Sequence, residues 1–210
     1  KEYERKFGNV VNTDNVRELS PDYVKDKSRL SSAVHEPASF LTKMILEAKL
    51  ARPVAEGKLP LLVATAGGTG SGKTTGVEKI DFFKKEVKNA DIFLDSNLSN
   101  FESAEKKIQQ ALKSGRGVVI NYVFRDPIEA MMGLPPENPA TPAESIQGGA
   151  LARAMRIGRA TPITSHVDTH FGSLDTIPEI IERHMDNPLV KIRLFHNAPG
   201  TGIVRINLDR

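Results

Sequence analysis

The chain has 210 residues, a net charge of +3 from 29 basic and 26 acidic residues, and no cysteine. This length suits one α/β domain and is short for two. The lack of cysteine excludes disulfide bonds and thiolate catalysis and is compatible with a cytoplasmic protein. The small, interspersed basic excess suits phosphate-bearing small molecules and gives no indication of nucleic acid as a partner. No apolar run reaches the length of a transmembrane helix, so we expect no membrane association.

The first part of the chain is predicted to form a strand and then a helix. The strand covers residues 10–13 and brings Asp14 to its carboxyl end. An apolar stripe between Val34 and Ala48 indicates a helix that begins near His35 or Glu36.

A glycine-rich stretch follows the next apolar strand, which is predicted at residues 59–65. Its sequence, Gly67-Gly68-Thr69-Gly70-Ser71-Gly72-Lys73-Thr74-Thr75, matches G-x-x-x-x-G-K-[ST] at every fixed position. The glycines allow consecutive backbone N–H groups to face an anion, and an amphipathic helix comes next. Lys73 can reach the β- and γ-phosphates of a nucleotide, and the hydroxyl of Thr74 can bind Mg²⁺. The sequence therefore predicts a P-loop that binds ATP with Mg²⁺.

Strands and helices alternate through the rest of the chain. After the P-loop, an apolar stripe from Val77 to Val87 indicates one continuous helix. Further strands are predicted at residues 90–95, 117–124 and 189–195, with an edge strand at 203–208. A helix is predicted at residues 101–112, with Ser99 or Asn100 as its N-cap and Gly115 just beyond its end. Three more helices are predicted: a short one just after residues 125–127, one at 144–157, and one that begins with a cap at 176–178 and ends near residue 186. Four prolines between residues 133 and 143 indicate a surface loop.

This alternation predicts an α/β fold with a mostly parallel central sheet between two layers of helices. Together with the P-loop, it is the three-layer sandwich of a kinase-like P-loop NTPase.

Three charged residues follow predicted strands and are candidates for chemistry. Ligands gather at the carboxyl ends of parallel strands, where we expect Asp14, Asp95 and Arg125. Phosphoryl transfer needs positive charge and a carboxylate that orients or deprotonates the acceptor hydroxyl. Asp95 can contact Mg²⁺ or the substrate. The alternative for both aspartates is the capping of a turn or helix.

His166 and His170 have the i, i+4 spacing of a helical metal pair. Pro162, Thr164 and Val167 argue against a continuous helix there, and no Glu-x-x-His pattern accompanies the two histidines. We therefore expect a substrate contact or surface histidines in preference to a metal site.

Two further blocks resemble the zeta-toxin family of P-loop kinases. Asp14-x-x-Arg17-x-x-x-Pro21-x-Tyr23 is similar to the family's Asp-x-x-Arg-x-x-x-Pro-x-Tyr cassette, and Asp95-Ser96-Asn97-Leu98 resembles its Glu/Asp-Gly-Thr-Leu block. The resemblance covers residues 12–197 and implies an ATP-dependent kinase. Family members phosphorylate a hydroxyl of a nucleotide-containing metabolite, such as the amino sugar of UDP-N-acetylglucosamine. The resemblance also implies a cognate antitoxin as a partner, and either a cytoplasmic location or delivery into a target cell's cytoplasm as an effector.

The resemblance assigns roles to single residues. Asp14 matches the catalytic base, and Arg17 matches an arginine that faces substrate or phosphate. Arg153, Arg156 and Arg159 fall where the family has arginines that close on the ATP phosphates. We expect at least one of these three to be only part of a solvated helix face. The implied sets are Asp14, Lys73, Arg153 and Arg159 for catalysis, residues 67–75 and Arg156 for the nucleotide, Arg17, Asp95, Asn97 and Arg125 for the substrate, and Thr74 and Asp95 for the metal.

The order of these blocks departs from the family. The Asp-x-x-Arg cassette usually follows the P-loop helix, whereas here it precedes the P-loop strand, so the chain resembles a circularly permuted member. On this interpretation, residues 1–210 form one domain with a permuted strand–helix unit (1–58), a P-loop core (59–132), a loop and arginine lid (133–160) and a C-terminal unit (161–210). The first strand should lie at the sheet edge beside strand 91–95, followed by the P-loop strand and strands 117–124 and 189–195.

A second departure concerns the acceptor. The family's Thr-Leu-Arg reads Asn97-Leu98-Ser99, so an arginine that would touch the substrate is missing. The kinase chemistry is unaffected, but the absence favours a second hypothesis, an NAD or polynucleotide kinase on the same scaffold. A third hypothesis, a non-kinase ATPase switch, is weakened because no Asn-Lys-x-Asp sequence occurs.

Overall fold

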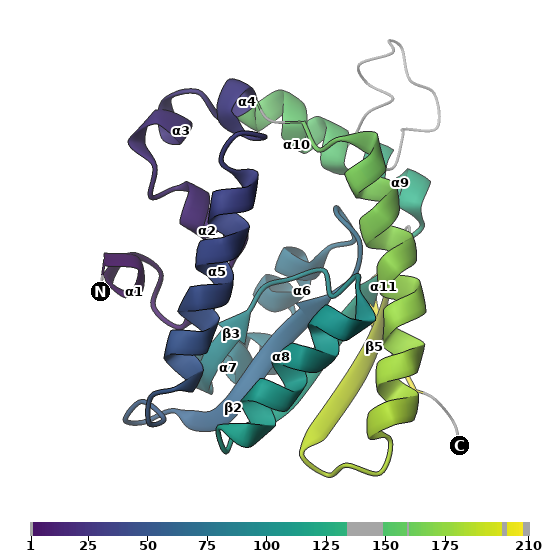
Figure 1. Ribbon diagram of the computed structural model, residues 1–210. Helices are drawn as coiled ribbons and strands as arrows, with labels where there is room; N and C mark the ends of the chain where they lie inside the picture. Colours follow the sequence, from purple (N-terminus) through teal and green to yellow (C-terminus); the bar gives the residue numbers. More distant parts are fainter. Residues whose placement is uncertain (1, 134–148, 159, 199–200, 208–210) are drawn as a thin grey trace.

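A computed structural model describes residues 2–133, 149–158, 160–198 and 201–207. Within these residues, a six-stranded sheet lies between two layers of helices (Figure 1). In chain order the elements are α1 (Glu2–Phe7), β1 (Val10–Val11), α2 (Thr13–Arg17), α3 (Pro21–Lys25), α4 (Lys27–Leu30), α5 (His35–Leu50), β2 (Leu59–Ala66), α6 (Lys73–Lys79), α7 (Asp81–Asn89), β3 (Ala90–Leu94), α8 (Phe101–Lys113), β4 (Gly117–Phe124), α9 (Pro127–Met132), α10 (Gly149–Ile157), α11 (Ile163–His184), β5 (Val190–Ala198) and β6 (Gly202–Ile206). No described helix is both long enough and apolar enough to cross a membrane.

The strands lie in the order β1-β3-β2-β4-β5-β6. The P-loop strand β2 is central and pairs in parallel with β3 on one side and β4 on the other. β1 adds in parallel to the outer edge of β3, and β5 adds in parallel to β4. β6 then pairs antiparallel with β5. The order expected from the sequence, with the first strand at the edge, is confirmed.

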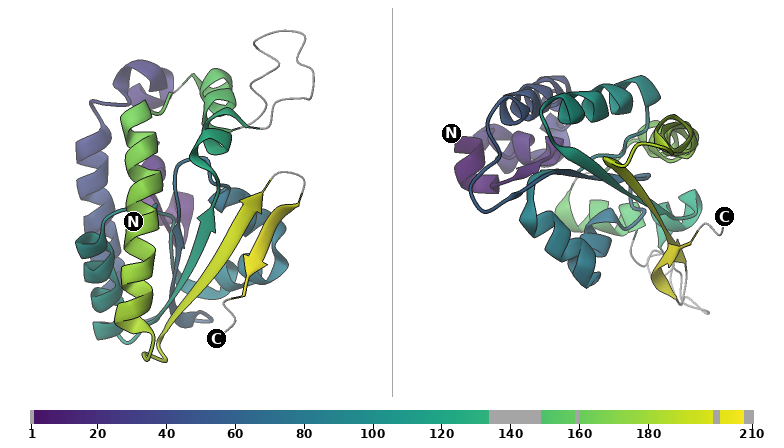
Figure 2. Two further views of the ribbon diagram at one scale, coloured as in Figure 1. Left: turned by 90° about the vertical axis from the view of Figure 1, so that its right-hand side faces the viewer. Right: turned by 90° about the horizontal axis from the view of Figure 1, so that it is seen from below.

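Alternate residues of the strands face two different layers of helices (Figure 2). On one face, α5, α8 and α11 cover the larger part of the core, in which Leu62, Ile92 and Ile120 are almost completely buried. On the other face, α6 and α7 pack against Val63 and Phe93. The P-loop strand is therefore buried on both faces, as its unbroken apolar sequence predicts.

The helix expected after the P-loop is in fact two helices. Ile80 is extended, with φ −97° and ψ 107°, and separates α6 from α7. The chain turns back here, and a Cβ at Gly76 would lie 3.6 Å from the ring of Phe83. The prediction of one continuous helix was wrong: the extended backbone of Ile80 ends α6, and Ile80 and Phe83 both pack in the core on this face of the sheet.

α11 is longer than expected. The sequence placed a helix start at Thr176-Ile177-Pro178, but α11 runs without a break from Ile163 to His184 with Pro178 inside it. Pro178 lacks the N–H that would continue the ladder. Ile177 and Ile180, both almost completely buried, pack on the sheet. This packing outweighs the local preference to stop, and it makes residues 163–175 helical as well.

The first strand is shorter than expected, and Asp14 does not end it. β1 stops at Val11, and the side chain of Asn12 accepts hydrogen bonds from the N–H groups of Asp14 and Asn15. Asn12 thereby caps α2, and Asp14 lies in the first turn of that helix.

Several other predictions are confirmed. α5 begins at His35, Asn100 caps α8, and Gly115 follows that helix with a φ of +78°. The predicted loop at 133–143 and the start of the helix at 144 fall almost wholly outside the described residues, and the described part of that helix is α10.

A buried ion pair ties α5 to the sheet at the end opposite the P-loop. Arg116, which is 1% exposed, donates through Nε to Asp91 Oδ2 at 2.7 Å. Its Nη atoms donate to the carbonyl oxygens of Leu50, at 3.1 Å, and Arg52, at 2.9 Å. One guanidinium therefore joins β3, the start of β4 and the end of α5.

We predict that Arg116→Met destabilises the protein by about 3–5 kcal/mol, since it leaves the carboxylate of Asp91 buried without its partner. The matched control is Arg52→Met. The Arg52 side chain is 55% exposed and pairs with Glu4 at the surface, so its loss should change the free energy of unfolding by about 1 kcal/mol or less. Urea unfolding followed by circular dichroism measures both. Equal losses in the two variants would contradict the assigned role of Arg116.

Candidate phosphate-binding site

The P-loop leaves the carboxyl end of β2 and enters α6 through a series of turns that need glycine. Gly70 and Gly72 have φ values of +80° and +103°, in the left-handed region. Among the described residues, none accepts a hydrogen bond from the N–H groups of Gly70, Gly72 and Lys73. These three donors are available to an anion, in the arrangement that the motif predicts.

Lys73 is the charged centre of the loop. Its Nζ donates to the carbonyl oxygens of Gly67, at 2.7 Å, and Gly68, at 2.8 Å, and to Asn97 Oδ1 at 2.8 Å. Asn97, expected to bind substrate, is thus a neighbour of the P-loop lysine. The amine is held at three points and carries its charge on the inner side of the loop.

The surroundings of Lys73 shift the pKa of its amine in opposite directions. Burial lowers the pKa of its amine to about 8, Asp95 opposes this shift, and the positive charge of Arg153 adds to it. Bound phosphate would supply the negative charge that this buried ammonium lacks.

The loop is packed so tightly that neighbouring groups occupy the places where side chains would start. A Cβ at Gly67 would lie 2.3 Å from the carbonyl oxygen of Val123, and one at Gly70 would lie 2.4 Å from that of Ala130. At Gly72 the neighbour is Nδ2 of Asn197, at 2.4 Å, and this nitrogen also donates to the carbonyl oxygen of Ser71 at 2.9 Å. Strand β4, helix α9 and strand β5 therefore all bear directly on the loop.

Asp95 follows β3 and joins the N-terminal unit to the P-loop strand. Its Oδ2 accepts from Asn12 Nδ2 at 2.6 Å, and its Oδ1 accepts from Thr65 Oγ1 at 2.8 Å. Asn12 also caps the helix that carries Asp14. The two aspartates are therefore linked through a single side chain, which brings the first and second sequence blocks together.

Asp14 and Arg17 form an ion pair on α2. Arg17 Nη1 donates to Asp14 Oδ1 at 3.0 Å, and Nη2 contacts His35 Nδ1 at the start of α5. The Asp14 side chain is 54% exposed, whereas that of Arg17 is 9% exposed. Asp14 is accessible to a ligand, and Arg17, predicted to face substrate or phosphate, contacts Asp14 and His35.

The remaining predicted arginines fall in different surroundings. Arg153 on α10 is half-buried and close enough to influence Lys73, while Arg156 on the same helix is exposed. α10 crosses above the carboxyl ends of the strands in Figure 1. Arg125 follows β4, and its Nε is buried without a hydrogen-bond partner among the described residues. Arg159 lies outside the described residues.

His166 and His170 are buried and do not lie at the surface. They are 2% and 3% exposed, and each donates from Nε2 to a carbonyl oxygen, that of Pro127 at 2.8 Å and that of Thr69 at 2.9 Å. Within the described part of the chain, no group of three or more His, Cys, Asp or Glu side chains could hold a metal ion. The expected surface position was wrong because α11 is continuous and carries both rings against the core.

Thr74 and Asp95 are the predicted Mg²⁺ contacts. Thr74 is exposed in the first turn of α6, and both carboxylate oxygens of Asp95 already accept a hydrogen bond. Mg²⁺ is usually held by one or two protein oxygens together with substrate phosphates and water, so a full protein cage is not required. The residues present fit an ion that enters with the nucleotide.

Sequence reasoning missed several residues of this site. Thr65 is a single hydroxyl in the apolar run of β2, a signal that could have marked it. Asn12, at the end of a strand and before an acidic helix start, has the pattern of an N-cap. Thr169 and Asn197 contact the loop from α11 and β5, and no local pattern identifies them.

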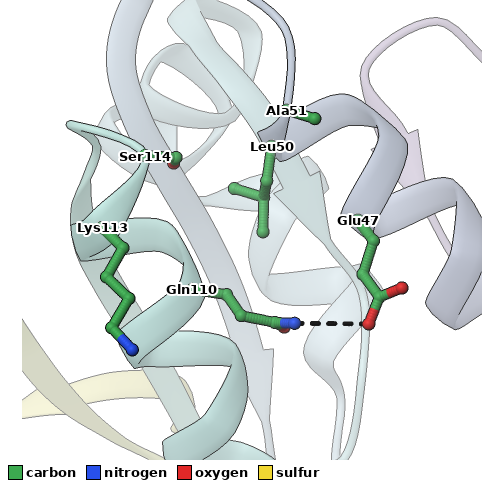
Figure 3. A pocket seen from close by; sticks show the side chains of 6 residues that line it. All are labelled: Glu47, Leu50, Ala51, Gln110, Lys113 and Ser114. Atoms are coloured by element: carbon green, nitrogen blue, oxygen red, sulfur yellow. Dashed lines mark hydrogen bonds between the residues drawn. The ribbon is translucent and has the colours of Figure 1, made fainter.

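A surface hollow of about 360 Å³ lies elsewhere, between α5 and α8 near the amino ends of the strands (Figure 3). Gln110 Nε2 donates to Glu47 Oε1 across it at 3.3 Å. The lining residues are Glu47, Leu50, Ala51, Gln110, Lys113 and Ser114. This hollow is separate from the P-loop, and it gathers none of the predicted site residues.

The lowered pKa of Lys73 gives a prediction for stability. Between pH 8 and about 10.5, the folded protein has lost the Lys73 proton that the unfolded chain still binds, so stability should rise with pH in this window. Lys73→Met, which keeps the length of the side chain, should lack this contribution, because other lysines titrate alike in both proteins. We expect a difference of at most a few kcal/mol, from about 1.4 kcal/mol for each unit of pKa shift. Urea unfolding at pH 7.5 and pH 10 measures it, and identical pH dependence in both proteins would contradict the assignment.

The sequence matches no protein-family model, and a comparison with curated proteins gave no match. Solved structures give similarities at low identity, and three of them are crystal structures of AvrRxo1-ORF1:AvrRxo1-ORF2 complexes. The native complex is 16% identical with a TM-score of 0.52, and the match covers 77% of this chain and 61% of that one. The complex with ATP is 17% identical with a TM-score of 0.54, with coverage of 81% and 66%. The complex with sulphate ions is 16% identical with a TM-score of 0.53, with coverage of 92% and 66%.

This chain spans less than two thirds of the length of the native neighbour and about two thirds of the other two. At such identities the similarity shows the fold alone. The protein therefore has a three-layer α/β fold with a P-loop and a mostly parallel six-stranded sheet in its described residues, similar to the fold of these complexes.

Proposed function

We propose that the protein is an ATP-dependent phosphotransferase of the zeta-toxin type. It transfers the γ-phosphate of ATP to a hydroxyl of a nucleotide-containing metabolite, with a sugar nucleotide similar to UDP-N-acetylglucosamine as the leading acceptor. The observation that carries this proposal is the P-loop, in which the Lys73 amine is held by loop carbonyl oxygens and the N–H groups of Gly70, Gly72 and Lys73 have no acceptor among the described residues. One of the structurally similar complexes contains ATP, which supports the nucleotide.

The proposed division of labour follows the site. Lys73, Thr74, Thr75 and the loop N–H groups bind the phosphates. Arg153, with Arg156 and Arg159, neutralises the charge that spreads over the transferring group. Thr74 and Asp95 would hold Mg²⁺, which would supply further neutralisation of the phosphate charge.

The proposed chemistry is an in-line displacement. Asp14 accepts the proton of the acceptor hydroxyl while the hydroxyl oxygen forms a bond to the γ-phosphorus. The bond from that phosphorus to the bridging oxygen breaks, and ADP leaves. Exposure of the Asp14 carboxylate supports this role, since a base must reach the acceptor, whereas both oxygens of Asp95 are occupied by Asn12 and Thr65.

The acceptor has a second candidate class. Asn97 binds Lys73, and Leu98-Ser99 follows it, so no arginine stands where the family's substrate arginine is expected. This supports an NAD or polynucleotide kinase as the alternative, with Arg125 as the remaining cationic substrate contact.

Two further parts of the proposal are a circular permutation of the chain and a protein partner. The edge position of β1 beside β3 is what a circular permutation of the zeta-toxin order requires. The structurally similar proteins are two-component ORF1:ORF2 complexes, which supports a cognate antitoxin for this chain. The apolar side chains of Phe40, Leu41 and Met44 on α5 are exposed, as in a surface that a protein partner covers.

The test of this function is phosphate transfer in a metabolite extract. Incubation with Mg·ATP should yield a metabolite that has gained one phosphate, detected by mass spectrometry, and that acceptor should accelerate ADP release. Lys73→Ala should lower turnover by about 10²–10³-fold or more, the usual effect of removing a group that stabilises transition-state charge. Full turnover and unchanged ATP affinity in Lys73→Ala would exclude the P-loop role. An ADP release rate that no acceptor changes would favour the ATPase switch.

The two aspartates should separate kinetically. Asp14→Asn keeps the shape and removes the basicity, so kcat should fall by about 10²–10⁴-fold with little change in ATP affinity. Asp95→Asn should instead raise KM for Mg·ATP or the acceptor, because it alters a binding contact. Steady-state kinetics with the identified acceptor measures both variants. Near-normal kcat in Asp14→Asn together with a large loss in Asp95→Asn would reverse the assignment.

A further inference from the structure

Helix α11 forms hydrogen bonds with both the N–H and the carbonyl group of one P-loop residue, Thr69. The N–H of Thr69 donates to Thr169 Oγ1 at 3.1 Å, and the carbonyl oxygen of Thr69 accepts from His170 Nε2 at 2.9 Å. Since a carbonyl can only accept, the Nε2 atom of His170 carries the proton. Both peptide groups that flank the Thr69 Cα are therefore fixed by a helix about 100 residues away in the sequence.

The contact is close as well as hydrogen-bonded. A Cβ at Gly68 would lie 2.2 Å from the ring of His170, so the imidazole lies directly on the loop backbone. Two residues further along the helix, α11 approaches the segment after β3 just as closely, because a Cβ at Gly172 would lie 2.3 Å from the carbonyl oxygen of Ser99. Any longer side chain at position 68 or 172 would push the helix away from the loop.

His166 packs against His170 and supports its contact with the P-loop. Its ring centroid lies 4.5 Å from that of His170, and its Nε2 donates to the carbonyl oxygen of Pro127 at 2.8 Å. Thr169 Oγ1 also lies 3.1 Å from the carbonyl oxygen of His166, within the same helix. Burial lowers the pKa of His170, and His166 and Lys73 lower it further, against the opposing effect of the Thr69 carbonyl. Around neutral pH the imidazole therefore contacts the loop in its neutral form.

These contacts use the backbone of Thr69, and the N–H groups of Gly70, Gly72 and Lys73 have no acceptor among the described residues. Ordering a flexible backbone when a ligand binds lowers affinity, so a loop that is ordered in advance binds more tightly. We propose that Thr169 and His170, which we call the α11 clamp, are positioning residues that hold the P-loop in its phosphate-binding shape through Thr69. The effect on ATP rests on the proposed function, but the effect on loop order does not.

The first readout needs no nucleotide. In Thr169→Val, which keeps the shape and removes the hydroxyl, hydrogen–deuterium exchange at the amide of Thr69 should become about three- to tenfold faster, as expected for the loss of one hydrogen bond. His170→Ala should accelerate exchange across residues 67–72. Thr169→Ser and His170→Gln keep the hydroxyl and an N–H donor of similar reach, and should restore slow exchange.

The matched control is His184→Gln on the same helix. His184 is also buried and bonds to Glu105 at 2.7 Å, far from the P-loop. This variant should lose stability toward urea without faster exchange in the loop. If His184→Gln accelerates loop exchange as much as the clamp variants do, the effect is general destabilisation and the proposal is overturned.

The second readout is Mg·ATP binding by calorimetry. Thr169→Val and His170→Ala should each weaken binding by about three- to tenfold, while Thr169→Ser, His170→Gln and His184→Gln bind like the wild type. Unchanged exchange in both clamp variants would overturn the clamp whatever the affinity for ATP. If exchange becomes faster in the clamp variants but the wild-type protein does not bind Mg·ATP, the proposed function is overturned and the ordering role of the clamp is supported.

Discussion

The close packing of other backbone and side-chain groups on the P-loop is the constraint on which this site depends. Val123, Ala130, Asn197 and His170 each occupy space where a Cβ of the loop would lie, so four elements can fix the loop at once. The glycines of the motif are therefore required by the neighbours as well as by the backbone angles. A loop fixed in this way can present its N–H groups to an anion without being reorganised by it.

The same packing explains the chemistry of Lys73. Carbonyl oxygens of the loop surround the amine and satisfy its N–H groups, but they do not replace the water that burial removes, so the pKa falls. Asp95 supplies partial compensation, and it does so while bonded to the N-terminal unit through Asn12. The unit that precedes the P-loop in sequence is thus part of the electrostatic environment of the P-loop. Arg116 also ties this unit to the other end of the sheet through the carbonyl oxygen of Leu50 at the end of α5.

The sequence by itself determined the fold class, the strand order and the phosphate-binding loop. Buried parallel strands have nearly continuous apolar runs, and β2, β3 and β4 stand out for that reason. The P-loop is a local motif whose chemistry depends on residues that are adjacent in the chain, from Gly67 to Thr74. The edge position of β1 was expected from the resemblance of the sequence blocks to the zeta-toxin family, with the order of the blocks changed.

Only the tertiary structure decided how the site is supported. α11 crosses a proline and reaches back to Ile163 because buried side chains hold it on the sheet, a contribution that local propensity does not contain. That extension turned His166 and His170 from expected surface residues into buried supports of the loop. The contacts of Arg17 with Asp14 and with His35 on α5 are likewise visible only in the folded protein. In each case the deciding contact joins residues from different elements. The spacing of residues along the chain does not show which surfaces will come into contact.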